Sequence, residues 1–322
     1  MAEDKVEVLR AGCFFCHVRC GVLVTKVNGR ITDIKGDPDC PHNHGFTCSR
    51  LDKQRYLEGF VYNPNRLKKP LKRIGERGSG QWEEISWDQA FDEIAEKLAD
   101  LRDKYGAETL AFTEGTARTW SWLHYKFTNL FGTPNTGGNG TICYSSDMWL
   151  EPCTYGGFCS DKADWVNADV VVMWGRNTIA SEPLLWDWVQ KNREKNGAKI
   201  LCIDPRFSEV AQQADLFLQL RPGTDAALAL GMINVIIEED LYDHEFVDEW
   251  CIGFEELKER AAEYPVDKVA EITWVPEEKI RAAARMYATA ESASMPWAEM
   301  PPASTLPPPS RPKPSYEPLL AT

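Results

Sequence analysis

The chain has 322 residues, with 36 basic and 49 acidic side chains and a net charge of −13. This acidic excess disfavours a nucleic-acid-binding role, because such proteins need basic surface to neutralise phosphates. The length suffices for two or three domains, each with its own hydrophobic core. The longest apolar run, Ala226 to Ile237, is interrupted by Asn234 and is too short to span a bilayer.

The N-terminal residues Met1 to Gly12 contain neither an apolar stretch nor the twin arginine typical of an export signal. Ten cysteines without such a signal argue against a disulfide framework. We therefore expect a cytoplasmic protein whose cysteines serve as metal ligands or as small buried apolar residues.

Four cysteines near the start of the chain predict the first functional site. Cys13, Cys16 and Cys20 lie within one short turn, and 27 residues separate Cys20 from Cys48. Four converging thiolates hold either a tetrahedral zinc ion or an iron–sulfur cluster. Structural zinc sites usually draw on two short cysteine pairs, whereas a three-plus-one spacing suits the wider corners of a cubane. The spacing therefore favours a [4Fe–4S] cluster, with zinc or coincidental buried thiols as the alternatives.

Residues 21–34 predict a β-hairpin after the three-cysteine turn, because apolar residues alternate on both sides of Asn28-Gly29. The loop that follows brings Cys48 back. Arg50 would place a fixed cation beside a cluster. An arginine on the solvated surface is an equally good interpretation of this residue. Cys40 lies outside the four-ligand spacing and has no assigned role.

The next part of the chain predicts a linker and two helices. Residues 60–80 are basic and rich in proline and glycine, which is typical of a solvated linker. Ser86 opens a capping box and an amphipathic helix that ends at Tyr105-Gly106. A short strand at 109–113 and an aromatic-rich helix at 121–131 follow. The expected buried face of the first helix consists of Phe91, Ile94, Ala95, Leu98 and Leu101.

From Asp169 onward the pattern alternates between strands and helices. The predicted strands are 170–175, 199–203 and 214–218, and the first is apolar throughout, as in a parallel strand buried on both faces. The predicted helices are 184–196, 225–237, 243–250, 255–263 and 276–289. Residues 298–322 contain eight prolines and no periodicity, which predicts a disordered or polyproline tail.

Polar residues follow each of these three strands. Ligands of an open α/β sheet bind outside the carboxyl ends of its strands. Asp204 and Asp225 suit ribose or guanine groups, and Arg206 and Arg221 suit phosphates. A dinucleotide site is predicted here, although loop caps also place polar residues at strand ends. The absence of a G-x-G-x-x-G pattern disfavours ordinary NAD binding.

Together these motifs resemble the molybdenum or tungsten bis(pyranopterin guanine dinucleotide) oxidoreductases, the dimethyl-sulfoxide-reductase superfamily. The cluster spacing, Asp204-Pro205-Arg206 and residues 221–228 are similar to its signatures, and the resemblance covers residue 13 to about residue 297. Residues 230–273 are especially similar to the branch that contains acetylene hydratase, in a group that also includes the catechol dehydroxylases. The resemblance implies an α/β fold: a small β-rich [4Fe–4S] domain, then α/β domains that include a doubly wound, dinucleotide-binding-like one.

The resemblance also implies domain boundaries and site residues. The domains would be 1–59 for the cluster, 60–141 for half of a split α/β domain, 142–297 for the pterin-dinucleotide domain, and 298–322 for the tail. Cys143 would bind molybdenum or tungsten, with Cys153 and Cys159 as rivals, and Arg50 would lie between cluster and pterin. The implied cofactor contacts are Arg50, Gly175, Asn177, Asp204, Arg206, Gly223 and Asp225.

Two departures from the family pattern stand out. His17 follows the second cluster cysteine, where the hydratase carries an acidic residue, and a histidine there can still shuttle a proton. Family members are typically at least twice as long, so we expect a truncated chain, for example through a shifted reading frame.

The resemblance implies oxygen or hydroxyl transfer, (de)hydroxylation or hydration of a small molecule at the metal. A ferredoxin-like subunit would exchange electrons with the cluster. The alternatives are a non-catalytic electron-transfer protein with an empty pterin site and a zinc-stabilised binding module.

Overall fold

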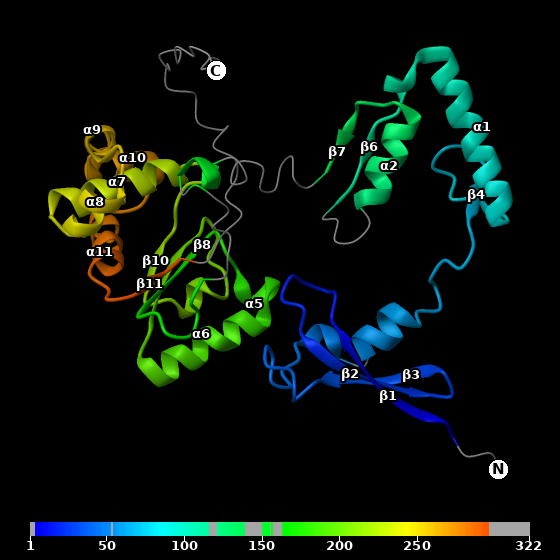
Figure 1. The fold of residues 1–322 in the computed structure, drawn as a ribbon, viewed down its shortest axis with the longest axis horizontal. Helices are drawn as coiled ribbons and strands as arrows, with labels where there is room; N and C mark the ends of the chain where they lie inside the picture. Colours follow the sequence, from blue (N-terminus) through cyan, green and yellow to red (C-terminus); the bar gives the residue numbers. More distant parts are fainter. Residues whose placement is uncertain are drawn as a thin grey trace, which may run out of the picture. The chain divides into compact units, whose positions relative to one another are not determined.

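The structure is a computed structural model that describes residues 4–52, 54–115, 121–138, 150–154, 156 and 163–295 (Figure 1). The chain divides into two compact units, Met1–Ser145 and Ser146–Thr322. Both units combine helices with small sheets, which confirms the predicted α/β class. None of the helices in the described part of the chain is long and apolar enough to cross a membrane.

The first unit begins with an antiparallel sheet in the order β1 (Val6–Gly12), β2 (Gly21–Val27) and β3 (Arg30–Gly36). The predicted hairpin is confirmed. Its turn residues Asn28 and Gly29 have φ angles of 51° and 83°, the left-handed pair that a two-residue turn between twisted strands requires. Strand β1, which the sequence analysis did not predict, pairs with β2 along its whole length.

The sheet is followed by a short 3-10 helix, η1 (Ser49–Leu51), and a π-helix, η2 (Gln54–Val61). The prediction of a plain linker over residues 60–80 was wrong in part. Strands β4 (Leu71–Arg73) and β5 (Trp82–Glu84) pair there as an antiparallel hairpin, which backbone hydrogen bonds stabilise despite the basic composition.

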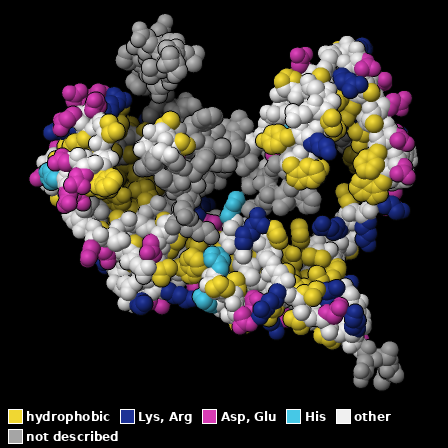
Figure 2. All heavy atoms as spheres, viewed as in Figure 1, with side chains coloured by type: hydrophobic (Ala, Val, Ile, Leu, Met, Phe, Trp, Pro, Cys, Tyr) yellow, Lys and Arg dark blue, Asp and Glu magenta, His cyan; other side chains and the backbone are white. Residues whose placement is uncertain are grey.

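Helix α1 (Trp87–Tyr105) begins as predicted, because the Ser86 side chain accepts a hydrogen bond from the backbone N–H of Gln89. The predicted burial of its apolar face is wrong for Phe91 and Ile94, which are 61% and 57% exposed, and for Ala95, which is also exposed. Helix α2 (Ser121–Phe131) matches its prediction and also carries exposed apolar side chains, visible in Figure 2.

Around these helices lie a 3-10 turn, η3 (Ala107–Thr109), and two short parallel strands, β6 (Phe112–Thr113) and β7 (Thr136–Gly137). Strand β6 occupies the end of the predicted strand 109–113, whose first residue belongs to η3.

The second unit contains a fully parallel sheet in the order β10 (Leu216–Leu218), β9 (Lys199–Ile203), β8 (Val170–Trp174) and β11 (Ala293–Ser294). All five residues of β8 are buried, as the apolar run predicted. The chain moves outward from β8 through β9 to β10 and then returns to the other side of β8 as β11. This reversal creates a switch point at the carboxyl ends of β8 and β11, the usual ligand crevice of such sheets.

Helices cover both faces of this sheet (Figure 1). Helices α5 (Thr178–Ser181) and α6 (Pro183–Asn196) connect β8 to β9, where Gly197 ends α6 with a φ of 75°. A 3-10 turn, η4 (Ala211–Gln213), precedes β10. The helices between β10 and β11 are α7 (Asp225–Glu238), α8 (His244–Trp250), α9 (Phe254–Ala262), α10 (Val266–Thr273) and α11 (Glu277–Ala288).

The hydrophobic core of the second unit forms between the sheet and this second group of helices. Its fully buried members include Leu201 and Ile203 of β9, Leu228 of α7, Val269 of α10 and Ile280 of α11. The core therefore holds the strand ends, and the polar residues that follow them, in fixed positions.

Candidate cluster and dinucleotide sites

The four predicted cluster ligands come together around the turn between β1 and β2. The turn closes through a hydrogen bond from the Cys13 N–H to the Cys20 carbonyl, 2.8 Å long. Burial, then the charges of Cys16, Cys13 and Cys48, raise the pKa of the Cys20 thiol to about 11. Burial likewise raises the pKa of Cys13, with further contributions from Cys16 and Cys48. The charges of all three other thiols thus act on Cys20, and those of Cys16 and Cys48 act on Cys13, so the cysteine from a distant part of the sequence acts on both.

The number and spacing of the thiols bear on the choice between zinc and a cluster. A single zinc ion needs sulfur ligands about 2.3 Å from the metal. A cubane spreads its four sulfur ligands over wider corners, which suits the three-plus-one spacing of these cysteines. The donor set of four cysteines is also the usual one for a [4Fe–4S] cluster.

Arg50 and His17 accompany these cysteines. Arg50 is half-buried, and its positive charge acts on the Cys13 thiol and lowers its pKa, against the larger effect of burial. The predicted cation therefore acts electrostatically on one of the cluster ligands. His17 is exposed and lies next to Cys16 in the chain. Cys40, which has no assigned role, has a lowered pKa because backbone N–H groups of His42 and Asn43 stabilise its thiolate.

Gly175 and Asn177 follow β8 at the switch point of the parallel sheet. Gly175 has a φ of 61°, and a Cβ placed on it would meet no atom within 4 Å, so its backbone borders open space. Asn177 donates a hydrogen bond through Nδ2 to Glu209 Oε2 at 2.7 Å, while its buried Oδ1 has no partner among the described residues. An open glycine backbone and an unused buried acceptor fit a bound polar ligand at this edge.

Asp204 and Arg206 follow β9. Asp204 is 7% exposed and accepts a hydrogen bond from the Arg206 N–H at 2.7 Å, so part of its role is to shape the turn. The Arg206 side chain is exposed and remains available to an anionic group. Glu209 lies nearby, and its own backbone N–H and the Asn177 amide lower its pKa.

The third strand end carries Gly223 and Asp225. Gly223 has a φ of 80°, a left-handed conformation that favours glycine. Asp225 is the first residue of α7, and its Oδ1 accepts a hydrogen bond from Trp174 Nε1 at 2.9 Å. This bond joins the end of β8 to the start of α7, and it could not be predicted because the partners are 51 positions apart in the sequence. Arg221 lies over the ring of Trp274, 5.5 Å from its centre.

Two of the predicted or rival metal ligands, Cys143 and Cys159, lie outside the described residues. Cys153, the other rival, is exposed.

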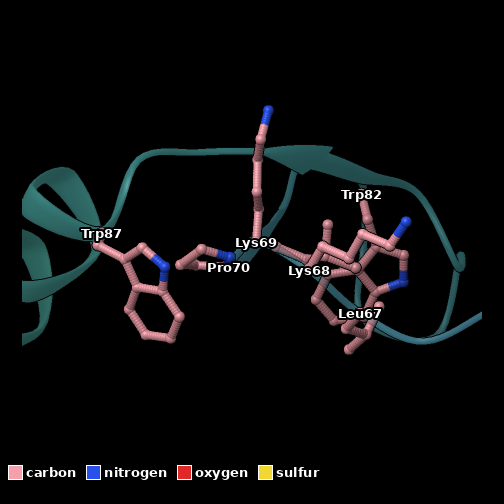
Figure 3. A pocket seen from close by; sticks show the side chains of 7 residues that line it. Leu67, Lys68, Lys69, Pro70, Trp82 and Trp87 are labelled. Carbon is pink, nitrogen blue, oxygen red and sulfur yellow. The ribbon is translucent and has the colours of Figure 1, made fainter. Parts of the chain in front are cut away.

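The first unit also has a surface groove. It has a volume of about 630 Å³ and is lined by Leu67, Lys68, Lys69, Pro70, Leu71, Trp82 and Trp87. Figure 3 shows Trp82 and Trp87 towards opposite ends, with Pro70 and Lys69 between them. None of the predicted site residues lines this groove, so we do not assign it to the cofactor site.

Comparison with known proteins agrees with this arrangement. A family model described as molybdopterin oxidoreductase matches residues 66–303, and one described as molybdopterin oxidoreductase Fe4S4 domain matches residues 6–52. Acetylene hydratase of Syntrophotalea acetylenica is 45% identical over 310 residues, which are 92% of this chain and 40% of that protein. The molybdopterin-containing subunit of Salmonella typhimurium thiosulfate reductase is 32% identical over 279 residues, 86% of this chain and 36% of that subunit.

The solved structures extend the comparison to the fold. Acetylene hydratase from Pelobacter acetylenicus superimposes with a TM-score of 0.74 and 38% sequence identity, covering 90% of this chain and 40% of that one.

Dimethyl sulfoxide reductase DmsA of Escherichia coli is a further relative in sequence, 34% identical over 274 residues, 79% of this chain and 33% of that protein. The chain thus spans about 40% or less of the length of these relatives.

Proposed function

The chain belongs to the molybdopterin oxidoreductase family, and we propose that it supplies the cluster-binding and dinucleotide-binding parts of an enzyme that adds, removes or transfers oxygen or hydroxyl groups. The two matched domains indicate a [4Fe–4S] cluster and a molybdenum or tungsten pterin as cofactors. The observation that carries the proposal is the gathering of Cys13, Cys16, Cys20 and Cys48, with the Arg50 charge acting at Cys13.

In this proposal the four thiolates hold the cluster and Arg50 carries positive charge at its edge. The pterin dinucleotide is bound at the strand ends by the backbone at Gly175 and Gly223 and by side chains of the second unit. Cys143 supplies a soft thiolate to the metal, as suits a high-valent ion already bound by sulfur. The metal, when bound, would supply a Lewis-acidic and redox-active centre for oxygen or hydroxyl transfer. The side chains assigned to the dinucleotide are Asn177, Asp204, Arg206 and Asp225.

The type of reaction follows from the relatives only as a proposal. The similarity to acetylene hydratases supports hydration of a small unsaturated substrate, in which no net electrons flow. His17 would exchange the proton of the reacting water. For a redox reaction a ferredoxin-like partner would exchange electrons with the cluster. A cytoplasmic setting fits the described cysteines, all of which are free thiols.

The match to both domains disfavours the alternative of a non-catalytic electron-transfer protein. Anaerobic purification with elemental analysis and electron paramagnetic resonance (EPR) separates the two functions. The proposed enzyme contains four irons, sulfide and one molybdenum or tungsten with pterin, whereas the electron-transfer protein contains iron and sulfide alone. One zinc per chain would overturn both.

Activity is then tested with three probes taken from the relatives. Acetylene hydration is measured without an electron donor, and reduction of thiosulfate or dimethyl sulfoxide with a reduced viologen dye. Conversion of acetylene alone supports the hydratase type. Conversion of none of the three by protein that contains both cofactors would contradict the proposed function for these substrate classes.

A further inference from the structure

Two exposed phenylalanines lie within the cysteine turn between β1 and β2. Phe14 and Phe15 separate Cys13 from Cys16 in the sequence, and they are 62% and 38% exposed. Folded proteins bury most such large apolar side chains, and exposed ones that gather in one place mark interaction sites. A protein that contacts these rings therefore also lies beside two of the four predicted cluster ligands.

Further rings extend this exposed surface onto η2. The ring centre of Phe15 lies 5.1 Å from that of Tyr56 and 5.7 Å from that of Phe60. The rings of Tyr56 and Phe60 stack on each other at 6.0 Å, and Phe60 is 50% exposed. We refer to Phe14, Phe15, Tyr56 and Phe60 as the aromatic patch. Because these contacts join the cysteine turn to η2, the patch has a defined shape within the first unit.

Two arginines lie over the aromatic patch. The guanidinium carbon of Arg19 is 4.6 Å from the ring centre of Phe14, and that of Arg66 is 5.2 Å from the ring centre of Phe60. Both arginines are exposed, and neither forms an ion pair with another residue that the structure describes. Arg19 has a φ of 59°, a strained conformation for a residue with a side chain, and such strain is concentrated at functional sites.

The charge of these two segments is opposite to that of the whole chain. Residues 13–20 and 54–66 contain three arginines and one acidic residue, Glu58, whereas the chain as a whole carries a net charge of −13. Positive charge around exposed rings is complementary to a partner that presents carboxylates around an apolar centre. Tyrosine and arginine are also among the residues that contribute most to binding at protein interfaces.

We propose that the aromatic patch, together with Arg19 and Arg66, is the docking surface for an acidic electron carrier of the ferredoxin class. This inference rests on the proposed function, because it needs the cluster that the four cysteines hold. Electron transfer slows steeply with distance, and a carrier seated on Phe14 and Phe15 lies next to two cluster ligands. In the transfer step the reduced carrier loses one electron and is oxidised, and the cluster of this chain gains that electron and is reduced. No covalent bond forms or breaks, and no proton is transferred.

The test uses the anaerobically purified, cluster-loaded protein and an acidic plant-type [2Fe–2S] ferredoxin, whose absorbance spectrum differs from that of a [4Fe–4S] cluster. Isothermal titration calorimetry measures binding, and stopped-flow absorbance measures the rate at which reduced ferredoxin passes its electron to the cluster. We expect binding and rate each to fall about tenfold or more when the salt concentration is raised.

The charge-reversing variant Arg66→Glu lies outside the cysteine turn, so that the cluster ligands are left in place. We expect it to bind ferredoxin, and to accept electrons from it, about tenfold more weakly and slowly at low salt. Arg19→Gln removes the other charge and is expected to have a smaller effect in the same direction. The rate of reduction by a small viologen dye, which needs no docking surface, corrects for any change in the cluster itself.

The matched control is Arg30→Glu. Arg30 also lies over an aromatic ring, 4.0 Å from the ring centre of Tyr62. It pairs with Val27 at the far end of β2, about 20 Å along the strand from the cysteine turn. We expect Arg30→Glu to bind ferredoxin and accept its electrons as the unmodified protein does.

Three results would overturn the inference and leave the proposed function intact. The first is equal binding and rates in Arg66→Glu and Arg30→Glu, or binding that does not depend on salt. The second is cluster-loaded protein that viologen reduces but that binds no ferredoxin, because another occupant would then cover the aromatic patch. The third is tighter binding of a basic c-type cytochrome than of ferredoxin, which would contradict the proposed charge of the partner. Purified protein without iron and sulfide would instead refute the proposed function, and the docking surface with it.

Discussion

The four predicted cluster ligands differ from Cys40 in their surroundings, and this difference makes a direct test. The charges of Cys13, Cys16 and Cys48 act on Cys20, whereas backbone N–H groups act on Cys40. We expect Cys20→Ser to bind the cluster at least about tenfold more weakly. Substitution of residues that only hydrogen-bond to a metal ligand already lowers metal affinity about tenfold. Iron and sulfide content and the EPR signal of the anaerobic protein measure the effect.

The matched control for this experiment is Cys40→Ser, which we expect to retain iron and sulfide at the level of the unmodified protein. Equal loss of the cluster in both variants would mean that the ligand set is wrong.

Cys202 gives a prediction about pH at the residue scale. It is fully buried in β9, and burial, with a smaller contribution from Asp204, raises the pKa of its thiol from 9.0 to about 12. The folded protein therefore holds a proton that the unfolded chain releases between about pH 9 and 12. The free energy of unfolding falls in this window by up to about 1.4 kcal/mol per pH unit from this thiol.

Urea unfolding of the unmodified protein and of Cys202→Ala, from about pH 8 to about pH 10.5, tests this prediction. The variant is less stable at the lower pH because it lacks buried sulfur, but its stability falls less steeply as the pH rises. If the stability of both proteins depended on pH in the same way, burial would not be keeping the Cys202 thiol protonated in the folded protein.

Close packing between two helices gives a prediction at the element scale. A Cβ placed on Gly231 of α7 would lie 2.8 Å from Cγ2 of Val269 on α10, and Val269 is fully buried. We expect Gly231→Ala to reduce the free energy of unfolding by about 1–3 kcal/mol through overpacking. Val269→Ala loses a comparable amount through a cavity.

The double variant Gly231→Ala/Val269→Ala tests whether the two residues share one contact. Because the new methyl group occupies space that the valine vacates, the double variant is expected to lose less stability than the sum of the single variants. Denaturant unfolding of all four proteins measures this coupling. Strict additivity would contradict the close approach.

Several elements could be predicted because their signals are local. The Ser86 cap fixes the start of α1, Asn28-Gly29 fixes the hairpin turn, and the continuous apolar run identifies β8. Helix α10 was not predicted because no side chain caps its start and Trp274, rather than a glycine, ends it with a φ of 64°. Strand β11 has only two residues and exists through its pairing with β8, which no local pattern encodes.

The candidate site divides in the same way. The cysteine spacing predicted the ligands that the structure brings together, and strand ends predicted Gly175 and Asp204. Contacts between distant residues were not predictable, as the hydrogen bond from Trp174 Nε1 to Asp225 Oδ1 shows. They depend on how strands and helices align in three dimensions, which sequence spacing does not specify.

At the scale of the whole molecule, the two units differ in what holds them together. The second unit has a continuous apolar core between its sheet and helices α7, α10 and α11. In the described part of the first unit, the buried apolar side chains are few, and large apolar side chains on α1 and α2 remain exposed (Figure 2). The buried apolar residues there are Val18, Val22, Leu51, Leu57 and Ala90. We therefore expect the first unit to draw more of its stability from a bound cluster than the second unit does.

Removal of the cluster is accordingly expected to affect the two units unequally. Oxidation and chelation of the iron remove the iron–sulfur bonds that connect the turn between β1 and β2 to Cys48. Strands β2 and β3 are then no longer stabilised by the cluster. We expect hydrogen exchange measured by mass spectrometry to accelerate strongly in β2 and β3, while β8 and β9 keep the protection that their apolar core provides. Protein incubated with chelator without oxidant, so that its cluster stays intact, is the control. Equal protection of β2 and β3 with and without the cluster would show that the antiparallel sheet is stable on its own, and that the metal contributes chemistry but no stability to the first unit.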